Sequence, residues 1–187
     1  MAPVDIALVH YPVLNKNKDI IGSAITNLDI HDIARAGRTF GIRSFYIVTP
    51  YHDQQQMAEE IVGHWRSGYG ASYNEDRKEA LAIVRICDSL QTLYAQTAAE
   101  REKTNILVTS AQSVIGVKTW PYPMVREKIK QKECFLILFG TAWGLADEVF
   151  AGVDGMLPPI QGDGDYNHLA VRSAVSIVLD RLLSSCG

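Results

Sequence analysis

Three separated stretches of the chain carry residues that could bind a ligand. The first is the run FGTAWGL, in which Phe139 and Gly140 end an apolar segment and Gly144 follows four residues later. Glycines at the end of a buried strand let main-chain N–H and C=O groups approach a ligand, because no Cβ stands in the way. The run lacks both the Gly-Lys-Ser/Thr of a phosphate loop and the G-x-G-x-x-G of a dinucleotide site. A plain turn between a strand and a helix is the alternative explanation.

The second stretch is LPPIQGDGDYNHLAVRSA, residues 157–174. Its two prolines favour an extended backbone, and Asn167 is expected to cap the last helix. Arg172 then falls in the first helical turn, where the helix dipole disfavours a cation. That unfavourable position suggests a functional role for Arg172. The alternative is a surface ion pair with Asp163 or Asp165.

The third stretch is NLDIHDIARAGRTFGI, residues 27–42. His31, Arg35 and Arg38 recur at i, i+4 and i+7 and therefore share one face of a helix. This face is basic in a chain whose formal net charge is −3. Asp32 could neutralise part of it, and an ordinary solvated amphipathic helix is the alternative.

The elements that position these stretches alternate along the chain. Asn27 or Asp29 is expected to cap the first helix and Ser89 the third. Apolar strands that alternate with helices predict an α/β domain, 1–187, with a mostly parallel sheet and helices on both faces. The expected strands are residues 5–10, 43–50, 80–87, 105–111, 134–140 and a brief 155–157, and the expected helices are 28–40, 54–68, 89–102, 123–131 and 168–183.

Composition limits the classes of function. With 187 residues and 47% hydrophobic content, the chain is typical of one globular domain. No apolar run is long enough to span a bilayer, and the start of the chain lacks a signal-peptide layout, so we expect a cytoplasmic protein with no membrane partner. A nucleic-acid role would need a local basic patch, because the net charge is negative. Cys87, Cys134 and Cys186 lack metal-ligand spacing, so we expect no metal and no disulfide framework.

Together and in this order, the three stretches resemble the sequence motifs of the SPOUT RNA methyltransferases. The likeness covers nearly the whole chain and is greatest to the compact, single-domain SpoU-like bacterial branch. The matching positions are Asn27, Arg35 and Phe40-Gly41 in the first motif, Ile137 to Thr141 with Gly144-Leu145 in the second, and Leu157-Pro158, Ile160, Asn167 and Leu169 to Val171 in the third.

The resemblance implies a deep trefoil knot near the C-terminus, with S-adenosylmethionine bound in the knot and S-adenosylhomocysteine as product. Backbone groups of three loops would hold the cofactor. Mapped onto this sequence, the cofactor-binding residues are Thr109, Ser110, Ala111, Phe139, Gly140, Thr141, Gly144, Leu145, Leu157, Pro159, Ile160, Asn167, His168 and Leu169.

The resemblance also implies a catalytic set and a partner. Arg35 would bind the target phosphate or activate the acceptor, Asn27 would shape that end of the site, and Arg172 is a second candidate. The substrate would be a tRNA or rRNA, with no DNA expected. A homodimer would let His31, Arg35 and Arg38 of one chain face the cofactor of the other, and His31 and Arg38 would bind the RNA backbone.

Two positions depart from the family pattern. Ala142 stands where SpoU-like sequences usually carry glutamate, and His168, Leu169 and Ala170 replace the usual asparagine-valine-serine. These changes leave open a second hypothesis, a catalytically weak or inactive SAM- and RNA-binding regulatory module of the same fold. A third is an unrelated α/β enzyme that binds a nucleotide phosphate at the glycine loop.

Aromatic and histidine residues elsewhere give weaker signals. Trp65 and Tyr69 lie at i and i+4 and could stack on a base, although helix packing is the commoner reason for such a pair. His10, His52 and His64 have no metal-ligand spacing, so we interpret them as ordinary surface or core histidines.

Overall fold

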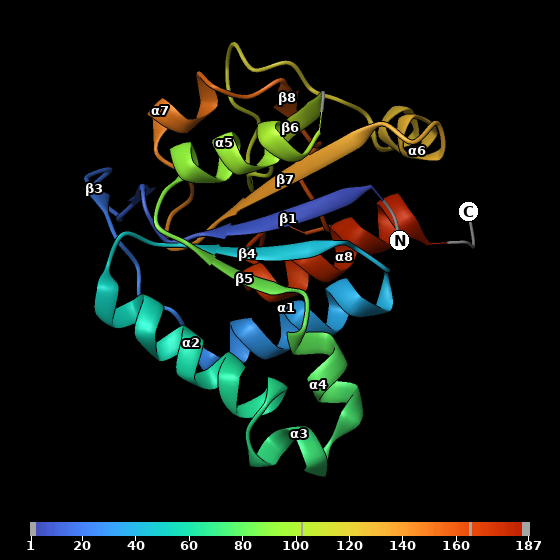
Figure 1. Ribbon diagram of the computed structural model, residues 1–187. Coiled ribbons are helices and arrows are strands. Elements are labelled where there is room, and N and C mark those ends of the chain that lie inside the picture. The colour runs from blue at the N-terminus through green and yellow to red at the C-terminus, as the bar shows by residue number, and fades with distance from the viewer. Residues whose placement is uncertain (1–2, 102, 165, 185–187) are drawn as a thin grey trace.

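A sheet of six parallel strands forms the centre of the molecule (Figure 1). The computed structural model describes residues 3–101, 103–164 and 166–184. The strand order is β5-β4-β1-β7-β6-β8, so the first strand of the chain lies near the middle. The strands are β1 Val4–Val9, β4 Ser44–Val48, β5 Val84–Cys87, β6 Thr104–Val108, β7 Cys134–Gly140 and β8 Gly155–Met156. Because every pairing is parallel, the carboxyl ends of all six strands meet at one edge. The predicted parallel α/β sheet is confirmed.

Helices cover both faces of this sheet (Figure 1). Those on one face are α1 Asn27–Thr39, α2 His52–Arg66, α4 Glu75–Leu81, α6 Tyr122–Lys130 and α8 Val171–Leu183, and those on the other are α5 Leu90–Glu100 and α7 Asp147–Phe150. Along β7, Phe135, Ile137 and Phe139 pack under the first group, while the residues between them pack under the second. This alternation buries the strand on both sides. None of the described helices is long and apolar enough to cross a bilayer.

Two regions differ from the sequence prediction. The strand expected over 80–87 begins only at Val84, because Ala80 and Leu81 end α4. The preceding α3, Tyr69–Tyr73, and α4 itself were not expected, although Asn74 caps α4 by accepting a hydrogen bond from the Arg77 N–H. A short antiparallel hairpin of β2 Val13–Leu14 and β3 Ile20–Ile21 lies in the segment expected to be irregular. Tertiary contacts therefore add short elements where local patterns are weak.

The helix caps correct two predictions and confirm one. Thr26, rather than Asn27 or Asp29, caps α1, and its hydroxyl accepts a hydrogen bond from the Asp29 N–H. Ser89 caps α5 as expected. Asn167 does not cap α8, because the helix begins only at Val171. The Asn167 side chain instead donates a hydrogen bond to the Ala111 carbonyl. The last helix therefore begins three residues later than expected.

The short strand β8 is enclosed on two sides. On one side the Leu157 N–H donates to the Val108 carbonyl at 2.9 Å. On the other, the Met156 N–H donates to the Lys118 carbonyl and the Trp120 N–H donates to Met156, both at 2.8 Å. The chain that enters α8 therefore starts from between β6 and the segment 118–120.

Candidate active site

A cavity of about 820 Å³ lies at the edge where the parallel strands end. Its wall brings together the loop after β6, the loop after β7, the segment that leads into α8, and the chain at the start of α1. The expected cofactor residues that line it are Thr109, Ser110, Ala111, Phe139, Gly140, Thr141, Gly144, Ile160, Asn167, His168 and Leu169. Segments that are far apart in the sequence therefore converge on one cavity.

The loop after β7 is a tight turn that requires its glycines. A Cβ on Gly140 would lie 2.8 Å from the Leu145 nitrogen, so the loop folds back directly over this position. Gly144 has a φ of +106°, which side-chain-bearing residues rarely adopt. Its N–H donates to the Thr141 carbonyl at 2.9 Å, and its own carbonyl accepts from the Leu14 N–H at 2.9 Å. The loop is thus closed on itself and fastened to β2.

Behind this loop, a chain of hydrogen bonds starts at His10, whose side chain is fully buried. His10 Nδ1 lies 2.9 Å from Ser23 Oγ, which in turn bonds to Thr141 Oγ1, and the Thr141 hydroxyl donates to the Val9 carbonyl at 3.0 Å. The last donor fixes the direction of the others, so Nδ1 carries the imidazole proton. Burial lowers the pKa of His10 to about 4, against the opposing charge of Asp29. A neutral histidine therefore holds two hydroxyls that line the cavity.

The segment that leads into α8 is fastened to both neighbouring loops. The Asn167 side chain donates from Nδ2 to the Ala111 carbonyl at 3.3 Å, which joins this segment to the loop after β6. The Tyr122 hydroxyl donates to the Pro158 carbonyl at 3.2 Å. Burial raises the pKa of Tyr122, so this donor stays protonated at neutral pH. Two side-chain bonds thus fix the third part of the cavity wall.

Arg172 lies on the cavity wall and links α8 to α1. Its Nη1 is 3.4 Å from Asp29 Oδ1, and its Nε is 3.5 Å from Asp32 Oδ2. Asp163, one of the two partners considered from the sequence, forms no ion pair with it among the described residues, and Asp165 lies outside those residues. The Arg172 side chain remains 37% exposed, so its guanidinium is oriented by α1 and still accessible.

Some expected site residues lie elsewhere. Leu145 and Leu157 are buried core residues behind the wall, and Pro159 follows the lining residue Pro158 without lining the cavity itself. Asn27 is exposed at the first turn of α1 and does not line it either. Within one chain, residues next to these four positions in the sequence line the cavity, and the four residues themselves do not.

The basic face expected on α1 is directed toward α2 and α4. The His31 ring packs edge-on against Trp65 at 5.6 Å, and burial together with Arg77 lowers the pKa of His31. Arg38 forms an ion pair of 2.8 Å with Glu79 on α4. Arg35 is exposed and does not line the cavity. In a single chain these three side chains are therefore separate from the cavity.

Sequence reasoning missed several residues of the wall. Ser23, Thr26 and Asp29 line the cavity, and His10 supports it from behind. The spacing Thr-x-x-Asp before an apolar run is a capping signal and could have identified two of them. Ser23 gave no local signal, because its partner Thr141 is 118 residues away.

The described residues contain no group of three or more His, Cys, Asp or Glu side chains able to hold a metal ion. Cys87 is buried and free, and burial raises the pKa of its thiol. Cys134 is free and partly buried, whereas Cys186 lies outside the described residues. The polar groups that line the cavity include main-chain groups, the hydroxyls of Ser23 and Thr141, and the Arg172–Asp29 pair.

Comparison with known proteins gives a match along almost the whole chain. A family model described as SAM-dependent RNA methyltransferase matches residues 3–184. A protein of Oleidesulfovibrio alaskensis named tRNA (guanine-N(1)-)-methyltransferase is 40% identical over 178 residues, which are 95% of this chain and 41% of the relative. An uncharacterized protein of Aquifex aeolicus is 38% identical, and the match covers 97% of this chain and 88% of that protein. The chain thus spans about two fifths of the tRNA methyltransferase and most of the Aquifex protein.

A solved structure shares the fold. The SpoU methyltransferase AviRb from Streptomyces viridochromogenes, in complex with the cofactor AdoMet, matches with a TM-score of 0.59 and 13% identity. The match covers 96% of this chain and 56% of AviRb. At this identity the likeness concerns the fold, an α/β architecture built on a mostly parallel sheet.

Proposed function

Because the chain belongs to the SAM-dependent RNA methyltransferase family, we propose that it binds S-adenosylmethionine in the cavity and methylates an RNA nucleotide. The observation that carries the proposal is the convergence of three segments on one cavity at the carboxyl ends of the strands, namely residues 109–112, residues 139–144, and Pro158, Ile160 and residues 167–172. In open α/β sheets this edge is where ligands bind. The names of the relatives make tRNA the first RNA to test and guanosine the first nucleotide.

The cavity fits this cofactor in size and in chemistry. Its volume of about 820 Å³ lies within the range of about 300–1,000 Å³ for small-molecule sites. Gly140 and Gly144 keep side chains away from the turn, so a flat ring can approach main-chain polar groups. The hydroxyls of Ser23 and Thr141 add polar groups that the bonds to His10 and to the Val9 carbonyl hold in place. When bound, the cofactor supplies a methyl group that is already activated by a positively charged sulfur.

The residues of the chain then need to align the acceptor more than to activate it. Arg172 is our candidate for this task, because its guanidinium is held by Asp29 and Asp32 beside the cavity. A planar guanidinium suits a phosphate or a base edge. As the acceptor lone pair forms the new bond to the methyl carbon, the bond from that carbon to sulfur would break and leave its electrons on sulfur, and the acceptor N–H or O–H would lose its proton. Asp29, a carboxylate of the cavity wall, is our candidate to receive that proton.

We further propose that two copies of the chain form the working site. Asn27, Arg35, His31 and Arg38 lie away from the cavity of their own chain, and a second copy would bring them to the cavity of its partner. Exposed apolar side chains near the cavity support this arrangement, since a partner would cover them. They are Leu28 at 62%, Trp143 at 67% and Leu169 at 43% exposure. Sedimentation velocity measures the assembly directly, and a monomer at micromolar concentration contradicts it.

The trefoil knot is part of the same proposal. The loop from residue 109 to Trp120 leaves β6 and returns to pair with β8 from its other side. If the chain after β8 passes through this loop before it forms α8, the C-terminal segment is knotted. The support for this path is the position of β8 between β6 and the segment 118–120.

Two measurements test the proposed function. Isothermal titration calorimetry with S-adenosylmethionine should give binding at micromolar concentration, and the absence of binding refutes the proposal. Transfer of labelled methyl groups to RNA from a strain that lacks the gene should then be detectable, and mass spectrometry of the nucleosides identifies the target. Arg172→Ala and Arg35→Ala should each lower transfer at least tenfold, whereas the distant control Lys130→Ala should not. Full transfer by either arginine variant contradicts its assigned role.

A further inference from the structure

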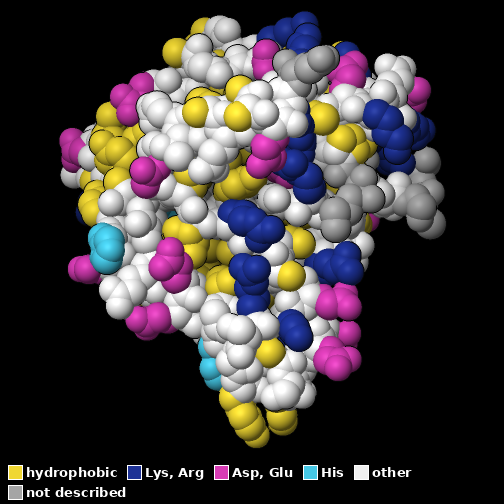
Figure 2. Space-filling model, in the orientation of Figure 1, with side chains coloured by type: hydrophobic (Ala, Val, Ile, Leu, Met, Phe, Trp, Pro, Cys, Tyr) yellow, Lys and Arg dark blue, Asp and Glu magenta, His cyan; other side chains and the backbone are white. Residues whose placement is uncertain are grey.

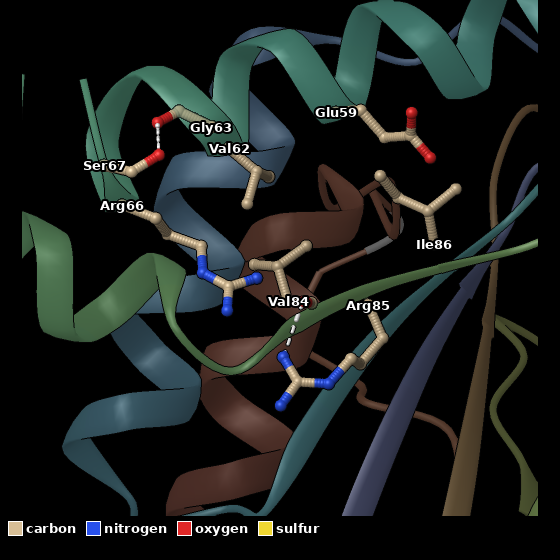
Figure 3. A pocket seen from close by; sticks show the side chains of 8 residues that line it. All are labelled: Glu59, Val62, Gly63, Arg66, Ser67, Val84, Arg85 and Ile86. Carbon is tan, nitrogen blue, oxygen red and sulfur yellow. Dashed lines mark hydrogen bonds between the residues drawn. The ribbon is translucent and has the colours of Figure 1, made fainter.

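A second, smaller hollow of about 320 Å³ lies between α2 and the edge strand β5 (Figure 3). Its polar side chains come from Glu59, Arg66 and Ser67 on or after α2 and from Arg85 on β5. In Figure 3 the guanidinium groups of Arg66 and Arg85 extend to the same side of the hollow, and Glu59 lies at the opposite end. The hollow therefore presents two cations together at one end.

Neither arginine is neutralised by the protein. Among the described residues, no carboxylate lies within ion-pair distance of Arg66 or Arg85, and both residues are exposed. Acidic partners are found instead at Arg38, Arg43, Arg101 and Arg172. Arg85 is also held in place, because its Nη1 donates to the carbonyls of Ala82 and Val84, each at 2.8 Å. Its orientation is therefore fixed before any ligand arrives, which lowers the entropy lost on binding.

Two exposed tyrosines follow the hollow along the chain. Tyr69 and Tyr73 lie on α3 and are 79% and 77% exposed. Figure 2 shows hydrophobic side chains protruding at the lower tip, where Figure 1 places α3, and a line of Lys and Arg side chains above them on the face that carries β5. Trp65, unlike the two tyrosines, packs against His31, His64 and Arg77, so its ring has a structural role in this part of the protein. A basic hollow beside exposed aromatic rings is typical of surfaces that bind single-stranded nucleic acid.

We propose that this surface, formed by Arg66, Arg85, Tyr69 and Tyr73, is a second RNA-binding site that holds an unpaired segment of the RNA substrate. Phosphates would lie against the two guanidinium groups, and bases would stack on the tyrosine rings. The inference rests on the proposed function in taking RNA as the partner, but it concerns a site distinct from the cavity.

The position of the surface agrees with this use. The first turn of α2 is fastened beside the cavity, because the Gln54 side chain accepts a hydrogen bond from the Ile25 N–H and Tyr51 lies against Gly22. Arg66 is at the other end of the 15-residue helix, which at 1.5 Å per residue is about 22 Å long. An RNA whose target nucleotide enters the cavity can therefore reach this surface with a part of its chain roughly 20 Å away.

Charge favours RNA over a second copy of the protein as the occupant. Two unpaired cations attract a polyanion, whereas a second copy seated symmetrically would bring its own Arg66 and Arg85 against them. The alternative to RNA binding is a contact between two copies of the protein through Tyr69 and Tyr73, and the second experiment below detects it.

The first experiment measures the salt dependence of RNA binding. Fluorescence anisotropy with unfractionated bacterial tRNA at several salt concentrations gives the dissociation constant and its slope. Arg66→Ala/Arg85→Ala should weaken binding about tenfold and reduce the slope by roughly 1.4–1.8, since each lost phosphate contact contributes about 0.7–0.9. Lys130→Ala, which removes one exposed cation from α6, is the matched control and should change neither quantity appreciably. If the double variant behaves like the control, the proposal is wrong.

The second experiment tests the tyrosines. Tyr69→Ala/Tyr73→Ala should weaken RNA binding at least about fivefold at every salt concentration and leave the slope unchanged, because stacking releases no counterions. An unchanged affinity together with a change in sedimentation would make the tip a contact between copies and overturn its assignment. S-adenosylmethionine binding should be normal in both double variants. If the unaltered protein does not bind S-adenosylmethionine, only the proposed function is refuted. The RNA-binding measurements are made without the cofactor and do not depend on that result.

Discussion

The buried histidine behind the cavity predicts a specific loss of stability in acid. His10 has a pKa of about 4 in the folded chain and an ordinary value of 6.5, so the unfolded chain binds a proton at a pH where the folded chain does not. Stability is therefore retained above pH 6.5 and falls as the pH decreases toward 4. The structural cause is that Nδ1 already donates to Ser23, so the added proton must sit on Nε2, which is buried and has no partner among the described residues.

The magnitude follows from the two values. At pH 5 the unfolded chain is largely protonated at this histidine and the folded chain is not, and the linkage relation gives a loss of about 2 kcal/mol relative to pH 7.5. Urea unfolding at pH 7.5 and at pH 5.0 measures this difference. His10→Asn retains a donor for Ser23 and removes the titration, so its loss between the two pH values should be smaller by about 2 kcal/mol. His52→Asn, at an exposed histidine, should keep the loss of the unaltered protein. Equal pH dependence in all three proteins would refute the reasoning.

Further predictions concern the loops of the cavity and the core. Gly140→Ala should weaken S-adenosylmethionine binding at least tenfold in calorimetry, because the new Cβ would lie 2.8 Å from the Leu145 nitrogen, whereas Gly152→Ala, with open space around it, should bind normally. Asn167→Ala loses the bond to the loop after β6 and should bind the cofactor roughly two- to tenfold more weakly, and unchanged affinity would separate that bond from the site. Leu93→Ala, at a fully buried position, should lower the free energy of unfolding by about 2–5 kcal/mol in urea, and a change below 1 kcal/mol would mean that the core closes around the gap.

Much of the fold was visible in the sequence because burial on both faces leaves a plain pattern. β7 is a continuous apolar run, and Val175, Val178 and Leu182 mark the buried side of α8 at helical spacing. The same criterion failed at α4, where Ala80 and Leu81 end a helix and adjoin the apolar start of β5. When one continuous apolar run includes the end of a helix and the start of a strand, the sequence gives no signal for where the helix ends.

The cavity also has parts that could be predicted from the sequence and parts that could not. The glycine turn was predictable because the strand, the turn and the cavity-lining backbone are consecutive in the chain. Ser23 and Asp29 could not be placed from sequence alone, since their partners Thr141 and Arg172 are 118 and 143 residues away. Such contacts depend on strand order, and a pattern of alternating strands and helices does not determine which strands become neighbours.

The hydrogen bonds of Arg85 have a consequence for how the molecule meets other copies of itself. β5 forms one border of the sheet, and free carbonyl groups on a border strand can pair with a strand of another molecule and start intermolecular aggregation. Arg85 occupies the carbonyls of Ala82 and Val84 with its own side chain and places a positive charge beside them. At the other border, the two-residue β8 is flanked by the segment 118–120. Some hydrogen-bonding groups at both margins of the sheet are thereby engaged within the chain, so fewer of them are available to pair with another molecule.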